Sequence, residues 1–222
     1  MDDLNLIARQ VRHKLLDFYG IPTWRVPLDA VDELVCTILS QNTNDLNRDR
    51  AYSALRAKYP TWEQLMEADT NEVVSAIRLA GLSNQKGPRI QQVLNAIQKE
   101  RGSLDLSFLK DMPVEEARAW LEQFKGVGPK TAAIVLLFSL GMPAFPVDTH
   151  IHRVTTRLGL IPEGMSVEAA HPALESLFPP DTYQDVHLNL IQLGRQLCTA
   201  RQVHCDVCPL QSLCSYAKGH RN

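Results

Sequence analysis

Apolar side chains recur along this chain at three- and four-residue intervals, the spacing that places them on one face of an α-helix. The pattern is clear in "LDAVDELVCTILS" (residues 28–40), "TNEVVSAIRLAGL" (70–82), "KGPRIQQVLNAIQKE" (86–100), "PVEEARAWLEQF" (113–124) and "DVHLNLIQLGRQL" (185–197). We expect Thr70 to cap the second of these helices. A further segment, "KTAAIVLLFSLG" (130–141), is apolar nearly all round and predicts a central buried helix. Because no alternating strand pattern or hairpin turn occurs, the sequence predicts an all-α fold.

The length and composition are those of an ordinary globular protein. The 222 residues suffice for one large domain or two small ones, and 45% of them are hydrophobic and 22% charged. There is no run of about eighteen apolar residues, so we expect no membrane span. The N-terminal "MDDLNLIARQ" lacks the apolar segment of a secretory signal, and the predicted location is therefore cytoplasmic.

The net charge of −2 gives no support to a nucleic-acid binder, which is usually basic. The distribution of charge is more informative. Residues 125–157 carry four basic side chains against one acid, and residues 186–222 do the same, so each stretch has a local charge of +3. Both stretches also contain the motifs described next.

Four of the five cysteines lie near the C-terminus in the pattern C-x6-C-x2-C-x5-C: Cys198, Cys205, Cys208 and Cys214. Cys36 stands alone on an apolar helix face, which indicates a core position. Thiols so close together in a cytoplasmic-type chain favour a metal site over disulfides, with zinc and iron–sulfur as the candidates. Zinc ribbons usually separate two C-x2-C pairs by a dozen or more residues, whereas one compact loop favours a four-iron cluster.

The turn "KGVGPKTA" (125–132) predicts the start of a helix, with Gly128 as N-cap and Pro129 in the first helical position. Its glycines suit a positive φ or a close approach, and its backbone N–H groups suit a phosphate, although a generic helix connection has the same pattern. Lys130 falls in the first helical turn, where the helix dipole and Lys125 disfavour its protonated form. A neutral amine is a nucleophile.

Asp148 in "FPVDTHIHRV" is expected to cap a helix that begins near Thr149. A helix start keeps a carboxylate ionised, so the same residue can cap and take part in chemistry.

These features together carry a family resemblance. "FKGVGPKTAAIVLLFSLGMPAFPVDTHIHRV" (124–154) resembles the helix-hairpin-helix, Gly/Pro-rich loop and aspartate motif of the endonuclease III superfamily of DNA glycosylases. The cysteine loop resembles the [4Fe–4S] loop of that family at the same C-terminal place. "LSQNTNDLN" (39–47) and "GLSNQKGPRI" (81–90) are similar to family segments that lie along DNA, so the resemblance covers nearly the whole chain.

The resemblance implies a two-lobed helical fold. A six-helix barrel domain would cover residues 23–142, with the helix-hairpin-helix at about 113–139. Residues 1–22 and 143–222 would form the cluster domain. A damaged base would be flipped out of double-stranded DNA into the cleft between them.

The resemblance also implies the chemistry. Lys130 matches the nucleophile and Asp148 the catalytic carboxylate of a bifunctional glycosylase and abasic-site lyase, which cuts the strand by β-elimination. Relatives that do not cut hold another residue at the lysine position. The protein would act as a monomer in base excision repair and associate with the nucleoid.

The predicted DNA contacts follow from the same resemblance and from the local charge. The family places a glutamine wedge where Asn42 aligns, with Gln41 before it, so both are candidates. The full predicted set is Gln41, Asn42, Asn84, Lys86, Gly126, Gly128, Thr149, His150 and Arg201.

Three functions remain open at this point. Removal of an oxidised pyrimidine is the first, a thymine or uracil mismatch glycosylase is the alternative, and a non-catalytic damage-binding module is the third. "SQNTND" departs from the usual "SAQATD" of pyrimidine-specific members, and "AFPVDT" resembles the plant 5-methylcytosine glycosylases. An adenine-removing relative is disfavoured, because such enzymes carry a glutamate where Ile38 aligns and lack the lysine.

Overall fold

The computed structural model describes residues 2–219, and within that range the regular elements are helices. The extended pairing among these residues is one isolated antiparallel bridge between Cys198 and Val203. The all-α prediction is therefore confirmed. Arg221, which contributes to the second basic stretch, lies outside the described residues. In residues 2–219 no helix is both long and apolar enough to cross a membrane.

The chain divides into two compact units. The central unit is Pro27–Met142, and the terminal unit combines Met1–Val26 with Pro143–Asn222. The sequence places the first boundary at residue 22 or 23. The identity of these units as a helix-hairpin-helix barrel and a cluster domain stays a prediction.

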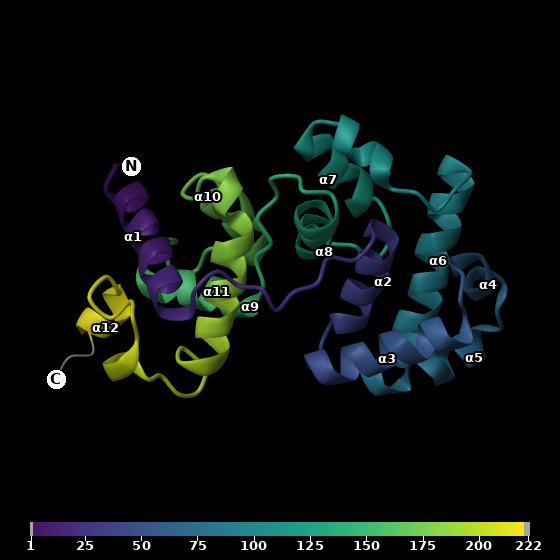
Figure 1. Ribbon diagram of the computed structural model, residues 1–222, viewed down its shortest axis with the longest axis horizontal. Coiled ribbons are helices and arrows are strands. Elements are labelled where there is room, and N and C mark those ends of the chain that lie inside the picture. Colours follow the sequence, from purple (N-terminus) through teal and green to yellow (C-terminus); the bar gives the residue numbers. More distant parts are fainter. Residues whose placement is uncertain (1, 220–222) are drawn as a thin grey trace. The chain divides into compact units, whose positions relative to one another are not determined.

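The central unit is built around α2, Ala30–Ser40, whose buried face includes Leu34 and Ile38. α2 packs against α3, α6, α8 and the π-helical turn that follows α8. Figure 1 shows these helices in dark blue to teal. The remaining elements of the unit are α3 (Asp45–Lys58), α4 (Trp62–Glu67), α5 (Thr70–Ala76), η1 (Arg78–Ala80), α6 (Ser83–Arg101), η2 (Ser107–Asp111), α7 (Val114–Glu122), α8 (Pro129–Ile134) and the π-helical turn η3 (Val135–Ser139).

Two details of the central unit differ from the sequence prediction. The cap of α5 is Asp69, one residue before Thr70, and its carboxylate accepts from the backbone N–H groups of Asn71 and Glu72. The predicted buried helix 130–141 is buried over Thr131–Phe138, but its α-helical part ends at Ile134 and continues as the π-helical turn. An apolar pattern reports burial, and it does not distinguish an α-turn from a wider one.

The terminal unit packs α11 against both α1 and α9. Arg12 of α1 forms an ion pair with Asp185 of α11, with Nη2 and Oδ2 2.6 Å apart. Phe145 is fully buried, with the rings of Phe178 and Tyr183 next to it. The elements are α1 (Asp2–Tyr19), α9 (Thr149–Leu158), α10 (Val167–Glu175), η4 (Pro180–Thr182), α11 (Tyr183–Gln196), η5 (Cys205–Val207) and α12 (Ser215–Gly219).

Candidate functional site

The hairpin turn between α7 and α8 places Lys130 in the first turn of α8. Gly128 is the N-cap of this helix and Pro129 its first residue, as the sequence predicts. Gly126 has φ +90°, a conformation that favours glycine. Gly128 has φ −105° and open space around its α-carbon, so it needs neither of the conditions predicted for the glycines of this turn. Lys130 is half-buried and Lys125 exposed.

The loop after α2 separates the two wedge candidates. Gln41 is half-buried, and its side-chain amide donates to the carbonyl oxygen of Gly126 at 3.2 Å. Its Oε1 accepts from Nη1 of Arg89 at 3.1 Å. Asn42 is exposed, with φ +53°. The structure therefore brings Gln41 to the hairpin turn and leaves Asn42 at the surface of the central unit.

The start of α6 holds two further predicted residues, which differ in exposure. Asn84 is exposed, consistent with a surface role. Leu82, which sequence reasoning missed, is the N-cap of α6, has φ +49° and is 48% exposed. A bulky apolar residue in the left-handed region is uncommon. The sequence around Leu82, including Gly81 before it, does not indicate this conformation.

Lys86 is buried, and this corrects its assignment as a DNA contact. Its side chain is 1% exposed, and Nζ donates to the carbonyl oxygens of Leu39 and Ala80, each at 2.7 Å. Burial, with a smaller effect from the charge of Arg89, lowers the pKa of Lys86 to about 8. An ammonium already bonded to two buried carbonyls is not available to a phosphate. Lys86 instead satisfies carbonyls at the ends of α2 and η1.

Asp148 is the N-cap of α9 in the terminal unit, as predicted. Its carboxylate accepts from the backbone N–H of Ile151 at 2.8 Å. The next two residues, Thr149 and His150, are exposed and half-buried. His150 contributes Nδ1 to a 3.1 Å contact with Nη2 of Arg153, which also donates to the carbonyl oxygen of Gly194.

The segment before Asp148 is fixed by side chains that sequence reasoning missed. The backbone N–H of Phe145 donates to Glu175 at 2.7 Å, and its carbonyl oxygen accepts from Nδ1 of His171 at 2.9 Å. The carbonyl oxygen of Pro146 accepts from Nδ1 of His187 at 2.9 Å. These contacts from α10 and α11 set the backbone that ends in Asp148. The two residues of each contact are 26 to 41 positions apart in the sequence, so no local sequence pattern predicts these contacts.

The cysteine loop is fastened to α9 by arginine. Arg157 donates to Sγ of Cys198 at 3.2 Å and to the carbonyl oxygen of Thr199 at 2.8 Å. Sγ of Cys214 lies 3.3 Å from the carbonyl oxygen of Arg157. Arg201 is exposed on the same loop.

The four thiols of the loop influence one another. Burial raises the pKa of Cys208 to about 11, and the charges of the other three cysteines contribute to the rise. The pKa of Cys205 is also raised, by burial and by the charges of Cys214 and Cys198. In residues 2–219, however, no group of three or more His, Cys, Asp or Glu side chains is arranged so that it would hold a metal ion. Cys36 is buried in α2, as its pattern predicts.

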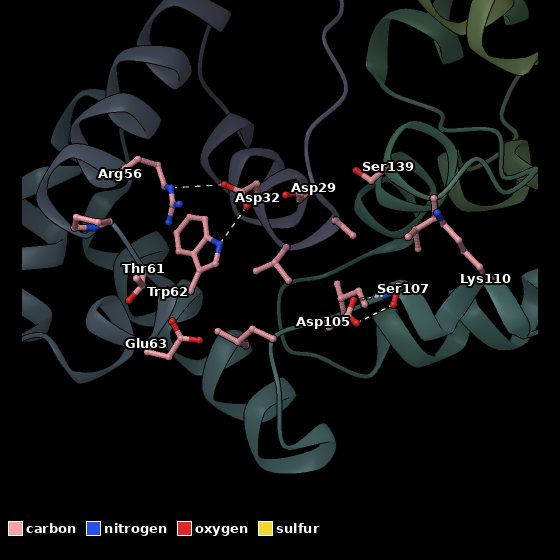
Figure 2. A pocket seen from close by; sticks show the side chains of 16 residues that line it. Asp29, Asp32, Arg56, Thr61, Trp62, Glu63, Asp105, Ser107, Lys110 and Ser139 are labelled. Carbon is pink, nitrogen blue, oxygen red and sulfur yellow. Dashed lines mark hydrogen bonds and ion pairs between the residues drawn. The ribbon is translucent and has the colours of Figure 1, made fainter.

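A pocket of about 570 Å³ in the central unit is lined by none of these residues. Figure 2 shows Trp62 and Arg56 on one side of it and Ser139 on another. Asp32 accepts from Nε1 of Trp62 at 3.2 Å and from the hydroxyl of Tyr52. The guanidinium of Arg56 lies over the Trp62 ring, 4.4 Å from its centre. These contacts hold α2, α3 and α4 together, so the side chains that make them have a structural role.

Three comparisons relate the chain to known proteins. The sequence model of the "HhH-GPD superfamily base excision DNA repair protein" family matches residues 35–180. A candidate DNA glycosylase of Arabidopsis thaliana is 37% identical over 75% of this chain, which spans 57% of that protein's length. Endonuclease III of Sulfolobus acidocaldarius is 34% identical over 82% of this chain and 80% of its own. A trapped covalent intermediate of endonuclease III with DNA is 27% identical, with a TM-score of 0.84, and the match covers 98% of this chain and 99% of that one.

Proposed function

The chain belongs to the endonuclease III family of the HhH-GPD superfamily of base excision DNA repair proteins, and from this premise we propose that it is a bifunctional DNA glycosylase and abasic-site lyase. The family predicted from the sequence is thereby confirmed. The proposed substrate is double-stranded DNA that contains a damaged base, with an oxidised pyrimidine as the first choice. The observation that supports the activity best is the position of Lys130, directly after the Gly-Pro turn in the first turn of α8.

Lys130 is proposed as the nucleophile. Its amine forms a bond to C1′ of the sugar while the C1′–N bond to the base breaks and the base leaves with a proton. The product of this step is an aminal at C1′. The C1′–O4′ bond of the sugar then breaks, O4′ takes up a proton, and a protonated imine forms between lysine and the opened sugar. The imine acidifies the proton on C2′, and loss of that proton expels the 3′ phosphate, which cuts the strand. Water then hydrolyses the imine and regenerates the lysine.

Asp148 is proposed as the carboxylate that accompanies this chemistry. The hydrogen bond from Ile151 and the positive end of α9 stabilise the negative charge of its carboxylate. A carboxylate can accept a proton from an amine and stabilise the positive charge that develops on the sugar as the base leaves. The contacts of Phe145 and Pro146 with α10 and α11 hold the backbone that presents it.

We also infer that Cys198, Cys205, Cys208 and Cys214 hold a [4Fe–4S] cluster. Two observations fit: the hydrogen bond from Arg157 to the sulfur of Cys198, and a buried hydroxyl on Tyr19 that has no hydrogen-bond partner. Tyr19 lies near enough to Cys208 for that thiolate to contribute to its raised pKa of about 12, after burial. Bound iron would supply four thiolate bonds that hold the loop.

Each unit contains residues that are proposed to contact DNA. In the central unit they are Asn42, Leu82, Asn84 and the turn Gly126–Gly128. An exposed leucine is the kind of side chain that DNA-bending proteins insert between base steps. In the terminal unit they are Thr149, His150 and Arg201. The protein is proposed to act as a monomer on chromosomal DNA, and hence at the nucleoid.

A panel of duplexes tests the proposal, each duplex carrying one modified base or one abasic site. Base release and strand cleavage are measured separately. We expect release of oxidised pyrimidines and cleavage at abasic sites. If only thymine or uracil in mismatches is released, the proposed substrate is wrong and the proposed activity still stands. Tight binding with neither release nor cleavage would make the chain a damage-binding module and defeat the proposal.

A further inference from the structure

Two loops of the central unit converge on Arg89, which the proposed chemistry does not use. Arg89 lies in α6 and is half-buried. Its Nη1 donates to Oε1 of Gln41, in the loop after α2, at 3.1 Å. A Cβ atom placed on Gly126 would lie 2.2 Å from Cδ of Arg89 and 2.3 Å from Nε, so the side chain rests directly against the backbone of the hairpin turn.

The amide of Gln41 completes a link between these loops. Its nitrogen donates to the carbonyl oxygen of Gly126 at 3.2 Å, while its oxygen accepts from Arg89. The two partners fix the orientation of the amide, because a carbonyl requires a donor and a guanidinium requires an acceptor. Both ends of Gln41 are therefore engaged within the protein. The glycine at position 126 is needed on two counts: its φ is +90°, and a larger residue would displace Arg89.

The residue that follows Gln41 is in the opposite situation. Asn42 is exposed and has φ +53°, a conformation that asparagine tolerates better than most residues. Before this loop, the end of α2 is also fixed, because Lys86 donates a hydrogen bond to the carbonyl oxygen of Leu39. The loop is thus held at its base and at Gln41, with Asn42 projecting from it.

We propose that Arg89 is a positioning residue that fastens the loop after α2 to the hairpin turn through Gln41, so that Asn42 is presented for insertion into the duplex. The inference rests on the proposed function. It assigns Gln41 to the link and Asn42 to the wedge. A loop that is already fixed loses less conformational freedom when its side chain replaces a flipped base, so insertion is favoured.

The test uses Arg89→Met, which keeps much of the aliphatic packing against Gly126 and removes the guanidinium. Single-turnover rates are measured on a duplex with a paired damaged base and on a duplex with a pre-formed abasic site. We expect the rate on the paired lesion to fall about tenfold, the effect of one lost charge-assisted hydrogen bond. The abasic site requires less unstacking, so its rate should change much less. Arg89→Lys should restore part of the loss.

Arg78→Met is the matched control, since Arg78 is exposed in η1 of the same unit and its loss changes the charge equally. An equal fall on both substrates, or an equal fall in Arg78→Met, would mean that Arg89 acts through its charge and would overturn the proposal. Unchanged rates in Arg89→Met would do the same. If that variant fails to fold, Arg89→Lys and Gln41→Leu carry the comparison.

A double-variant cycle separates a link from two independent contacts. If Arg89 acts through Gln41, the variant with both Arg89→Met and Gln41→Leu should lose no more than the worse single variant. Additive losses would contradict the link. Asn42→Ala should lower the rate on paired lesions, both alone and when combined with Arg89→Met or Gln41→Leu. A wild-type protein that fails to cut abasic sites would defeat the proposed function itself, which is a different outcome from any of these.

Discussion

The carboxylate of Asp148 accepts a hydrogen bond from the backbone N–H of Ile151, with 2.8 Å between the two atoms. The contact makes the proposed catalytic carboxylate the N-cap of α9 as well, and substitutions can separate the two roles. Asp148→Asn keeps an acceptor oxygen for the cap and loses the charge. We expect little change in thermal unfolding and a base-release rate lower by roughly 10²–10⁴, the range typical of a general acid–base group.

Asp148→Ala supplies the control for the cap. Losing the side-chain acceptor should reduce the free energy of unfolding by about 1 kcal/mol. Circular dichroism melts and single-turnover assays measure the two effects independently. An Asp148→Asn protein with wild-type rates would assign Asp148 to the cap alone.

The second prediction concerns the cysteine loop. Protein purified without oxygen should be yellow-brown and absorb broadly at about 400 nm, as expected of a cluster held by four thiolates. Cys205→Ser should lose the colour and become unstable. Cys36→Ala is the matched control: it removes a buried thiol outside the loop and should stay coloured. Colourless wild-type protein with stoichiometric zinc would contradict the proposed cluster.

The third prediction concerns Arg201. If its guanidinium contacts a phosphate, Arg201→Ala should weaken binding to all sequences alike and reduce the slope of log K against log salt by about one. Lys218→Ala, an exposed position in α12 of the same unit, should leave the slope unchanged. Binding titrations at several salt concentrations give both slopes. An unaltered slope in Arg201→Ala removes this residue from the interface.

The fourth prediction concerns pH and the buried Lys86. Its pKa is lowered from 10.5 to about 8, so between these values the unfolded chain binds the proton that the folded chain has released. The contribution of Lys86 to stability therefore rises with pH over this window, by up to about 3 kcal/mol. Lys86→Met lacks this contribution and leaves the carbonyls of Leu39 and Ala80 without their donor.

Denaturant unfolding of both proteins from pH 7 to 10.5 checks this expectation. Lys86→Met should be less stable at pH 7 by about 2 kcal/mol, and the difference should widen as the pH rises. A constant difference across the range would mean that Lys86 keeps an ordinary pKa in the folded protein.

The features that sequence reasoning predicted well are local ones. Gly128, Pro129 and Asp148 act within a few residues of their own positions, so capping chemistry identifies them without knowledge of the fold. The cap of α5 was misplaced by one residue because Asp69 and Thr70 are both good caps in succession. The helical class followed from periodicity, which depends only on near neighbours.

What the sequence could not supply depends on long-range packing. Lysine is usually a surface residue. The burial of Lys86 is explained only by its contact with the carbonyl oxygen of Leu39, 47 residues earlier in the sequence. Gln41 and Gly126 are 85 residues apart, so the sequence gives no sign of their contact, on which the proposed choice between Gln41 and Asn42 depends. The sequence likewise gives no indication that two histidines, His171 and His187, hold the segment before Asp148.

The last prediction concerns the nucleophile. If Lys130 attacks C1′, the protein and a damaged or abasic duplex share a covalent imine during turnover. Borohydride should reduce that imine to a stable amine and trap a protein–DNA adduct. Lys130→Gln keeps the polarity and roughly the length of the side chain but has no amine, so it should trap nothing and cut nothing while it still binds DNA.

Lys125→Gln is the matched control, because Lys125 is an exposed lysine of the same hairpin turn and has the same charge. It should bind DNA somewhat less tightly and still form the adduct. Mass spectrometry of the trapped wild-type protein should place the modification on the peptide that contains Lys130. An adduct that persists in Lys130→Gln would move the nucleophile to another amine. A wild-type protein that releases base but forms no adduct would be a glycosylase without lyase activity, with Lys130 serving only the binding of DNA.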